Sequence, residues 1–126
     1  SGVDVIWHSG DGIGLGVVQA AQEKDMYCLG NVADQHSLAP DNVLTGVVYQ
    51  WEAVIDSIFK DIREGNFCGR EEADRFYWIS AENNGLGYAP ITDSKGWLTE
   101  EDKTLIQETY EKLQKGEVEF PDFQQG

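Results

Sequence analysis

The sequence predicts an α/β fold with a mostly parallel sheet, flanking helices and a C-terminal hairpin. Three observations support this class. Apolar runs at residues 3–7 and 26–30 enclose a glycine-rich segment and a short helical pattern, which is typical of a β-α-β unit. A long amphipathic stripe follows residue 44, and Asn84-Gly85 is a strong turn signal between two short β-rich runs. With 126 residues, 40% of them hydrophobic, the chain is expected to fold as one domain, residues 1–126.

The charge of the chain excludes several function classes. Nine basic residues against 23 acidic ones give a net charge of −14, which repels nucleic-acid phosphates and anionic lipid. The sequence contains no run of 18 apolar residues, so no membrane span is expected. It shows no signal peptide and no initiator Met, so we expect a processed product, an engineered piece or a fragment. The compartment cannot be read from such a start.

The first unit of the chain is predicted in detail. Residues 3–7 read as a strand covered on both faces. The glycines at 10, 12, 14 and 16 are expected to form a tight turn that starts a helix. This helix would pack on the sheet through a stripe of small residues, Val17, Ala20 and Ala21. A second strand, residues 26–30, then leads into residues 31–35.

Candidate ligand-binding residues lie where these strands end, because ligands of open α/β sheets sit beyond the carboxyl ends of the strands. An aromatic ring at Trp7 can stack on a flat ligand, which is worth about 0.5–1.5 kcal/mol; core packing is the alternative. Asp11 and Asp34 are interpreted as hydrogen-bond acceptors, with solvated turn acids as the alternative. The predicted ligand-binding residues are Trp7, Gly10, Asp11, Asn31, Asp34 and Tyr49.

A nucleotide site is the main alternative for this region. The glycines at 10, 12, 14 and 16 miss the G-x-G-x-x-G register, and no Lys-Ser or Lys-Thr follows them. Asp11 would oppose a phosphate at the helix N-terminus. Asp34, however, lies where a ribose-binding acid is expected. A Rossmann-like nucleotide-binding enzyme or regulatory domain therefore remains the second hypothesis.

Catalytic and metal chemistry has little support in the sequence. His8 and His36 lie at the ligand end, and we expect both to be loop histidines bonded to solvent or backbone. Ser9 lacks a G-x-S-x-G context, and no metal-ligand spacing occurs. We therefore predict no enzyme activity, no catalytic residue, no cofactor and no metal. Cys28 is expected to be a buried thiol, with a Cys28–Cys68 disulfide open only in an oxidising compartment.

A long helix is predicted after Pro40, with Gly65 as its C-terminal cap. Its apolar residues fall on one helical face that is expected to cover the sheet, with a partner helix as the alternative. Trp51 would be a core residue on that face, whereas Tyr49 lies off it and would point toward the cleft or to solvent. The face comprises Leu44, Val47, Val48, Trp51, Val54, Ile55, Ile58, Phe59 and Ile62.

The C-terminal part is predicted to contain a hairpin and a helix. Residues 70–74 read as a charged loop or helix extension, and strands at 75–80 and 86–89 would pair across Asn84-Gly85. Thr99 begins the last helix with a near capping box, Gly116 ends it, and an extended tail follows. The inward stripe of this helix would be Leu105, Ile106, Thr109, Tyr110 and Leu113.

Four motifs occur in order along the chain: VIWH at 5–8, LGNVADQ at 29–35, APDNVLT at 39–45 and NGLGYAP at 84–90. Together they resemble the basic membrane protein family of lipoproteins, substrate-binding proteins of ABC importers that include purine nucleoside receptors. The resemblance implies a type I periplasmic-binding-protein fold, with the ligand clamped between two α/β lobes. It also implies an extracytoplasmic location and an ABC permease as partner. A complete member is much longer, so this chain resembles its C-terminal part.

The resemblance assigns roles position by position. An aromatic residue that stacks on the ligand base stands where Trp7 stands, and Asp34 matches the second acid of a two-acid pattern, followed by Gln35. Val32 replaces the first acid, and Tyr49 replaces a lysine. These departures remove groups that would hold a ribose, so a bare purine base fits better than a nucleoside. An isolated lobe could also self-associate through its exposed hinge face.

Overall fold

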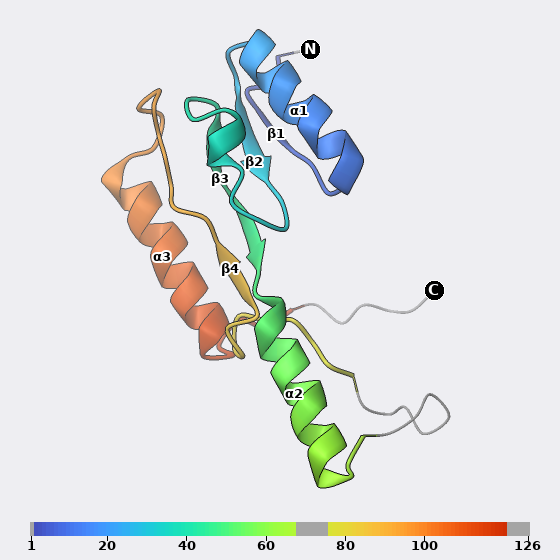
Figure 1. The fold of residues 1–126 in the computed structure, drawn as a ribbon. Helices are drawn as coiled ribbons and strands as arrows, with labels where there is room; N and C mark the ends of the chain where they lie inside the picture. The colour runs from blue at the N-terminus through green and yellow to red at the C-terminus, as the bar shows by residue number, and fades with distance from the viewer. Residues whose placement is uncertain (1, 68–75, 121–126) are drawn as a thin grey trace, which may run out of the picture.

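The structure, a computed structural model, describes residues 2–67 and 76–120. Its elements follow one another from blue to red in Figure 1. They are β1 (Val5–Trp7), α1 (Asp11–Glu23), β2 (Tyr27–Gly30), a short 3-10 helix η1 (His36–Leu38), β3 (Val43–Tyr49), α2 (Trp51–Glu64), β4 (Leu86–Tyr88) and α3 (Glu100–Gln114).

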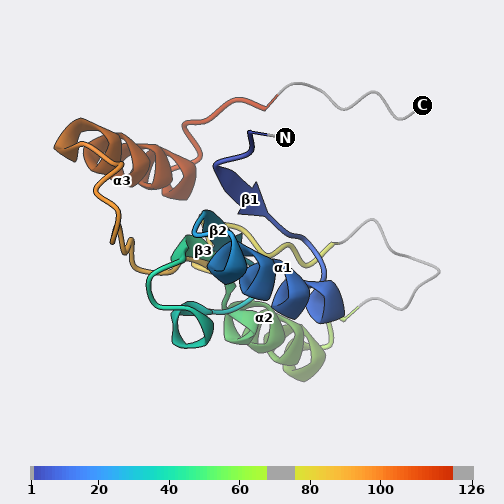
Figure 2. The ribbon, with the colours of Figure 1, turned by 90° about the horizontal axis from the view of Figure 1, so that it is seen from above.

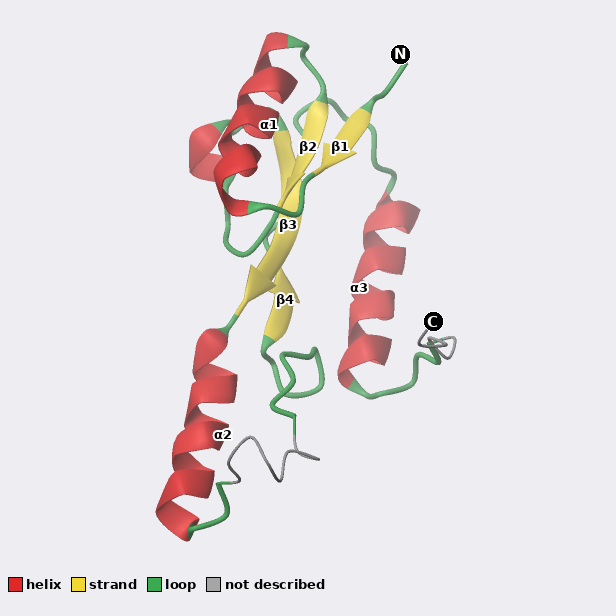
Figure 3. Cartoon of the chain, turned by 90° about the vertical axis from the view of Figure 1, so that its right-hand side faces the viewer, coloured by secondary structure: helices red, strands yellow, loops and turns green. Residues whose placement is uncertain are grey.

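The four strands form one sheet in the order β1-β2-β3-β4. The first three strands are parallel, and β4 runs antiparallel to the second half of β3. In the view from above, α1 covers the region of β2 and β3 while α3 stands apart (Figure 2). Figure 3 shows α1 and α3 on opposite sides of the sheet. The predicted class, a mostly parallel sheet with flanking helices, is confirmed.

The core lies between α1 and the sheet. Its buried residues are Val18, Ala21, Cys28, Ala39 and Val43. The helix starts earlier than predicted: Gly10 is its N-cap, so the glycines at 12, 14 and 16 lie within α1 rather than in a turn. The small-residue stripe is also displaced, because Ala20 is exposed and Val18 is buried in its place. Cys28 is a free thiol whose pKa is raised by burial, and Cys68 lies outside the described residues.

The predicted long helix is wrong in its first part. Residues 43–49 form strand β3, which pairs with β2 on one side and β4 on the other. The spacing of Leu44, Val47 and Val48 fits a helix face. The segment is nevertheless rich in β-branched residues, which favour a strand, and here it pairs with a neighbouring strand along each of its two edges. The helix begins only at Trp51 and ends at Gly65, whose φ of 72° confirms the predicted C-cap.

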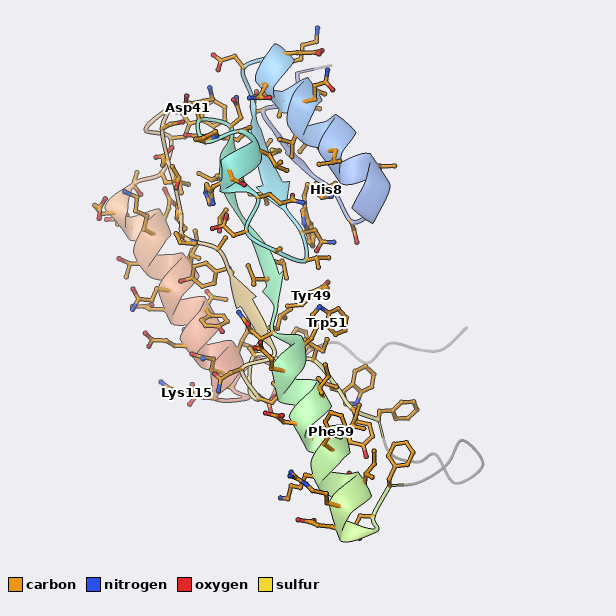
Figure 4. All side chains as sticks on the ribbon, in the orientation of Figure 1. His8, Asp41, Tyr49, Trp51, Phe59 and Lys115 are labelled. Carbon is orange, nitrogen blue, oxygen red and sulfur yellow. The ribbon has the colours of Figure 1, made fainter. Side chains whose placement is uncertain are left out.

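The α2 helix projects from the end of the sheet (Figure 1). Its large apolar side chains are exposed. Four large side chains, named here the α2 apolar face, are about half exposed: Trp51 53%, Ile55 46%, Phe59 57% and Ile62 50%. No described helix or strand packs along α2. In Figure 4, Trp51 lies at the junction with β3 and Phe59 lies further along the helix. The expectations that this face covers the sheet and that Trp51 belongs to the core are therefore wrong.

The predicted C-terminal hairpin is also wrong. Residues 76–80 are not a strand, residues 68–75 lie outside the described part of the chain, and β4 pairs with β3 instead. The turn at 81–84 is present, and its Asn84 has a φ of 58°. Residues 76–78 lie beside α2, where Tyr77 donates a hydrogen bond to Asp61 at 2.6 Å.

Helix α3 begins and ends where predicted, but its stripe is not fully inward, because Leu105 is 61% exposed. Thr99 Oγ1 accepts a bond from the Asp102 backbone, and the Asp102 carboxylate accepts one from the Thr99 backbone at 2.8 Å. The Thr99 hydroxyl also donates to the Asp102 carboxylate at 2.7 Å, and this bond, followed by the one from the Thr99 backbone amide, lowers the pKa of Asp102. The Tyr110 hydroxyl donates to the Leu86 carbonyl at 2.9 Å and ties α3 to β4. An apolar groove of about 450 Å³ lies between α3 and the strands β3 and β4. The predicted stripe of α3 forms part of its lining.

The segment between β4 and α3 is fastened along the sheet. The backbone amides of Ala89 and Thr92 donate to carbonyls of β3 at 2.8 and 2.7 Å. The hydroxyl of the fully buried Tyr27 donates to Asp93 at 2.7 Å, which is the largest cause of the lowered pKa of that carboxyl. This segment therefore fixes the start of α3 to β2 and β3.

Candidate functional site

The parallel strands β1 and β2 end opposite Thr45 and Gly46 of β3, and β3 continues from there to Tyr49. Residues 8–10 follow β1, residues 31–35 follow β2, and Tyr49 ends β3. The Tyr49 amide donates to the Val32 carbonyl at 2.9 Å, which ties the 31–35 loop to the end of β3. This edge of the sheet, where β1 and β2 end, is the candidate ligand-binding site.

Trp7 is exposed at this edge. Its side chain is 59% accessible, so the alternative of core packing does not hold. The indole borders a small apolar hollow of about 180 Å³ that shares three lining residues, Thr45, Val47 and Tyr88, with the groove beside α3. Together with Trp7, Leu29 and Gly46 complete the lining of the hollow. An accessible indole beside an apolar hollow can stack on a flat ring.

Asp34 is an oriented carboxylate. Its Oδ1 accepts bonds from the His36 backbone amide at 2.9 Å and from His36 Nδ1 at 2.5 Å. These two bonds hold the pKa of Asp34 below its usual range, the backbone bond being the larger cause. The Asp34 side chain is 51% exposed, whereas that of His36 is only 17% exposed. His36, predicted to bond to solvent or backbone, is therefore instead a partner of the Asp34 carboxylate.

His8 is not the loop histidine predicted from the sequence. Only 5% of it is exposed, and its ring lies against α1 at Gly14. Its Nε2 donates to the side-chain oxygen of Gln35 at 3.0 Å. His8 thus joins the loop after β1 to the loop after β2.

The remaining predicted site residues have different settings. Gly10 adopts an extended conformation as the N-cap of α1, and Asp11 is the first residue of that helix. Asn31 directly follows β2 and is buried. Tyr49 is half-buried and lies on β3 rather than on a helix. Its ring packs edge-to-face with that of Trp51, with the two ring centroids 5.7 Å apart (Figure 4).

The structure joins the two loops but does not place all candidates in one cavity. The hollow beside Trp7 is not lined by Asp34, Asn31 or Tyr49. Val32 shows strain, because its φ of 73° lies in the left-handed region that β-branched residues rarely adopt. Such strain persists only where surrounding contacts hold it, and here the Tyr49 bond does so.

Sequence reasoning missed the His8–Gln35 and Asp34–His36 pairs. The second pair had a local signal, because an Asp side chain in a loop often accepts a hydrogen bond from the backbone amide two residues later and forms an Asx turn. The first pair spans 27 positions and had none. Within the described residues, no group of three or more His, Cys, Asp or Glu side chains could hold a metal ion. The helices described also include none that is long and apolar enough to span a bilayer.

Comparison with known proteins finds relatives much longer than this chain. The Bacillus subtilis (strain 168) transcriptional activator protein med is 28% identical over 93 residues, which are 73% of this chain and 28% of med. Basic membrane protein D of Borreliella burgdorferi (strain JD1) is 32% identical over 88 residues, or 68% of this chain and 25% of that protein.

Solved structures share the fold. A solute-binding protein of an ABC transporter system from Conexibacter woesei DSM 14684 matches with a TM-score of 0.64 and 25% identity over 97% of this chain and 38% of that one. A solute-binding protein from Aeropyrum pernix K1 matches with a TM-score of 0.74 and 17% identity over 98% and 41%. A transcriptional activator of the comK gene from Bacillus halodurans matches with a TM-score of 0.71 and 23% identity. The match covers 95% of this chain and 39% of that one.

The chain therefore spans about a quarter of the length of the relatives and about two-fifths of the length of the solved structures. One family profile covers nearly all of it, residues 1–119. With this match, the parallel sheet and the shared fold, the chain belongs to the Bmp family, described as ABC transporter substrate-binding protein PnrA-like.

Proposed function

We propose that this chain is one ligand-binding lobe, with part of the hinge, of a longer solute-binding protein that delivers a small flat polar molecule to an ABC permease. Membership of the substrate-binding family supports the role. The observation that carries the ligand class is the accessible Trp7 indole at the edge of the sheet where the oriented Asp34 carboxylate also lies. An aromatic platform after one strand and an acceptor after the next favour a planar ring that carries N–H donors.

The proposed ligand is a purine base or a nucleoside, with the base favoured. The ring of such a ligand would stack on Trp7, and its donors would meet Asp34. Val32 and Tyr49 offer fewer ionic groups for a ribose than an acid and a lysine would, which supports the bare base. Gly10, Asp11 and Asn31 complete the proposed set at the same edge. We propose no chemistry by this site, since the family is one of binding proteins.

The second wall of the site would come from the remainder of the longer protein. The α2 apolar face supports this, because a large exposed apolar patch on a protein surface usually marks an interface. The proposal places the whole protein outside the cytoplasm, where solute-binding partners of permeases work. The net charge of −14 fits a protein that avoids nucleic acid.

Titration calorimetry of the longer protein with adenine, guanosine and inosine tests the proposal. We expect adenine to bind, and Trp7→Ala to weaken it on the order of tenfold through lost stacking. Trp97→Ala is the matched control, because this indole is 48% exposed but packs against Tyr27 at the opposite end of β2. Tight guanosine binding without base binding would refute the base, and equal losses in both variants would refute stacking at Trp7.

A regulatory protein is the second candidate function. The observation in its favour is the 28% identity to a protein named transcriptional activator. The strong negative charge makes this chain a poor DNA-binding element, so it would act as a sensor for the same ligand class. Transport assays in a strain lacking the gene separate the two, since a regulator alone leaves uptake unchanged when its target genes are expressed independently.

A further inference from the structure

We infer that His8 and Gln35 form a positioning pair that sets the distance between the two loops of the proposed site. The inference rests on the proposed function for its consequence, though not for its geometry. Neither residue is proposed to touch the ligand, because His8 is 95% buried and its polar contact is internal.

The His8 imidazole is seated by a glycine. A Cβ built on Gly14 would lie 2.4 Å from Cε1 of the ring and 2.8 Å from its Nδ1. Real Cβ contacts are not that short, so the ring rests against the bare backbone of α1. By contrast, Gly12 and Gly16 on the same helix have open space around the corresponding position. Gly14 is therefore the position at which α1 accommodates His8.

The hydrogen bond fixes one tautomer of the ring. An amide oxygen only accepts, so the 3.0 Å contact with Gln35 Oε1 requires the proton on His8 Nε2. Nδ1 is buried and has no hydrogen-bond partner among the described residues. The bond to Gln35 is thus the polar contact that orients the ring.

The Gln35 side chain also packs against the backbone of Gly30. A Cβ on Gly30 would lie 3.1 Å from Gln35 Oε1 and 3.4 Å from Gln35 Cβ, so the side chain fills the space above that backbone. Gly30 in turn meets Gly46, where a Cβ would lie 2.7 Å from the Gly30 backbone. Three close approaches therefore connect α1, both loops, β2 and β3 without a gap.

Each member of the pair is the chain neighbour of a candidate ligand residue. Trp7 directly precedes His8, and Asp34 directly precedes Gln35. One hydrogen bond therefore sets the spacing of the stacking ring and the acceptor. A ligand that needs both at once binds well only when this spacing is held, because a misplaced contact must be restored at the expense of affinity.

The first test uses nitrogen NMR on the 126-residue chain at a pH where imidazoles are neutral. We expect His8 in the Nε2–H form and the Tyr49 amide, bonded to Val32, protected from exchange. Gln35→Leu should mix the tautomers and speed Tyr49 exchange on the order of tenfold. Gln35→Glu, which keeps an acceptor, should restore both. Gln22→Leu on the exposed side of α1 is the matched control.

The outcomes separate this inference from the proposed function. If Gln35→Leu leaves the His8 tautomer and Tyr49 exchange as in the parent chain, the positioning pair is refuted. If Gln35→Glu fails to restore them in a folded chain, it is refuted as well. If both change as expected and adenine binding by the longer protein falls about tenfold in Gln35→Leu alone, the inference is supported. If the NMR changes occur but no purine binds even the parent, the proposed function fails while the pair stands.

Discussion

Helices α1 and α2 have similar lengths but opposite environments. The inner face of α1 consists of small residues, and Val18 and Ala21 are buried against β2 and β3. The α2 apolar face consists of large residues that remain about half exposed. Apolar side chains of this size normally gain about 1.5–3 kcal/mol each from burial. Helix α1 therefore has its packing partner within the described residues, whereas the α2 apolar face has none there and, on our proposal, is covered by the remainder of the longer protein.

The difference also divides the chain into two kinds of surface. Around α1, glycines at 30 and 46 bring backbones into direct contact, and the loops of the candidate site are joined by side-chain bonds. Around α2, Phe76 and Trp78 add further exposed rings to the same end of the molecule. Contacts within the chain hold the candidate ligand residues of the first surface in place, whereas the second surface exposes large apolar side chains of the kind found in interfaces.

The largest effect is expected where the packed region has no spare room. Gly46→Ala places a methyl 2.7 Å from the Gly30 backbone, so the β2–β3 contact must open. We expect a loss of about 1–3 kcal/mol or more in the free energy of unfolding, measured by urea denaturation. Gly16→Ala is the control, because open space there should allow a gain of about 1 kcal/mol in helix propensity. Equal stabilities of the two variants would contradict the close approach.

A pair of truncations compares the two helices' surroundings directly. Val43→Ala removes two buried carbons beneath α1 and should cost about 2 kcal/mol in this chain. Phe59→Ala removes a larger but exposed side chain and should change stability by less than about 0.5 kcal/mol. In the longer protein the second value should rise to about 3–5 kcal/mol if the face is covered there. A large loss for Phe59→Ala in the short chain would show that α2 packs within it.

Relieving the strain in the site loop should stabilise the chain slightly. Val32 has a φ of 73°, a conformation that Asn adopts more readily than a β-branched residue. Val32→Asn should therefore raise the free energy of unfolding by about 1 kcal/mol. Val48→Asn, on the regular part of β3, should instead destabilise the chain. Thermal unfolding followed by circular dichroism measures both, and destabilisation by Val32→Asn would argue against the strained backbone.

The smallest effect concerns the segment that leads to α3. The pKa of Asp93 is lowered in the folded chain, mainly by the Tyr27 hydroxyl, so its contribution to stability is present above the unfolded pKa of about 3.9 and is lost as the pH falls through the folded value. Tyr27→Phe should raise the Asp93 pKa and lower stability at neutral pH. The difference between parent and variant should shrink in acid. A carboxyl titration by NMR, unchanged in the variant, would contradict this role.

The sequence predicted those elements whose signals are local. The capping box of α3 and the C-cap at Gly65 each depend on residues within a few positions of one another, and each element of the β-α-β unit has its own short apolar pattern. Strand β3 was mispredicted because Leu44, Val47 and Val48 fit a helical spacing as well as a strand, and only pairing with β2 and β4 decides between them.

The candidate site shows the same limit. Trp7 and Asp34 could be placed at one edge because parallel strands end together. The burial of His8 could not be foreseen, since it depends on a glycine in α1 and a glutamine 27 positions away. The exposure of α2 could not be foreseen either, because helical periodicity identifies an apolar face but not whether that face is covered.

The most direct test of the account is amide hydrogen exchange along α2, measured in this chain and in the longer protein of which we propose it is a part. If the remainder of the protein covers the α2 apolar face, the amides of residues 55–62 should exchange at least about 100-fold more slowly in the longer protein, while the α1 amides change little. Equal α2 exchange rates in the two proteins would contradict the account.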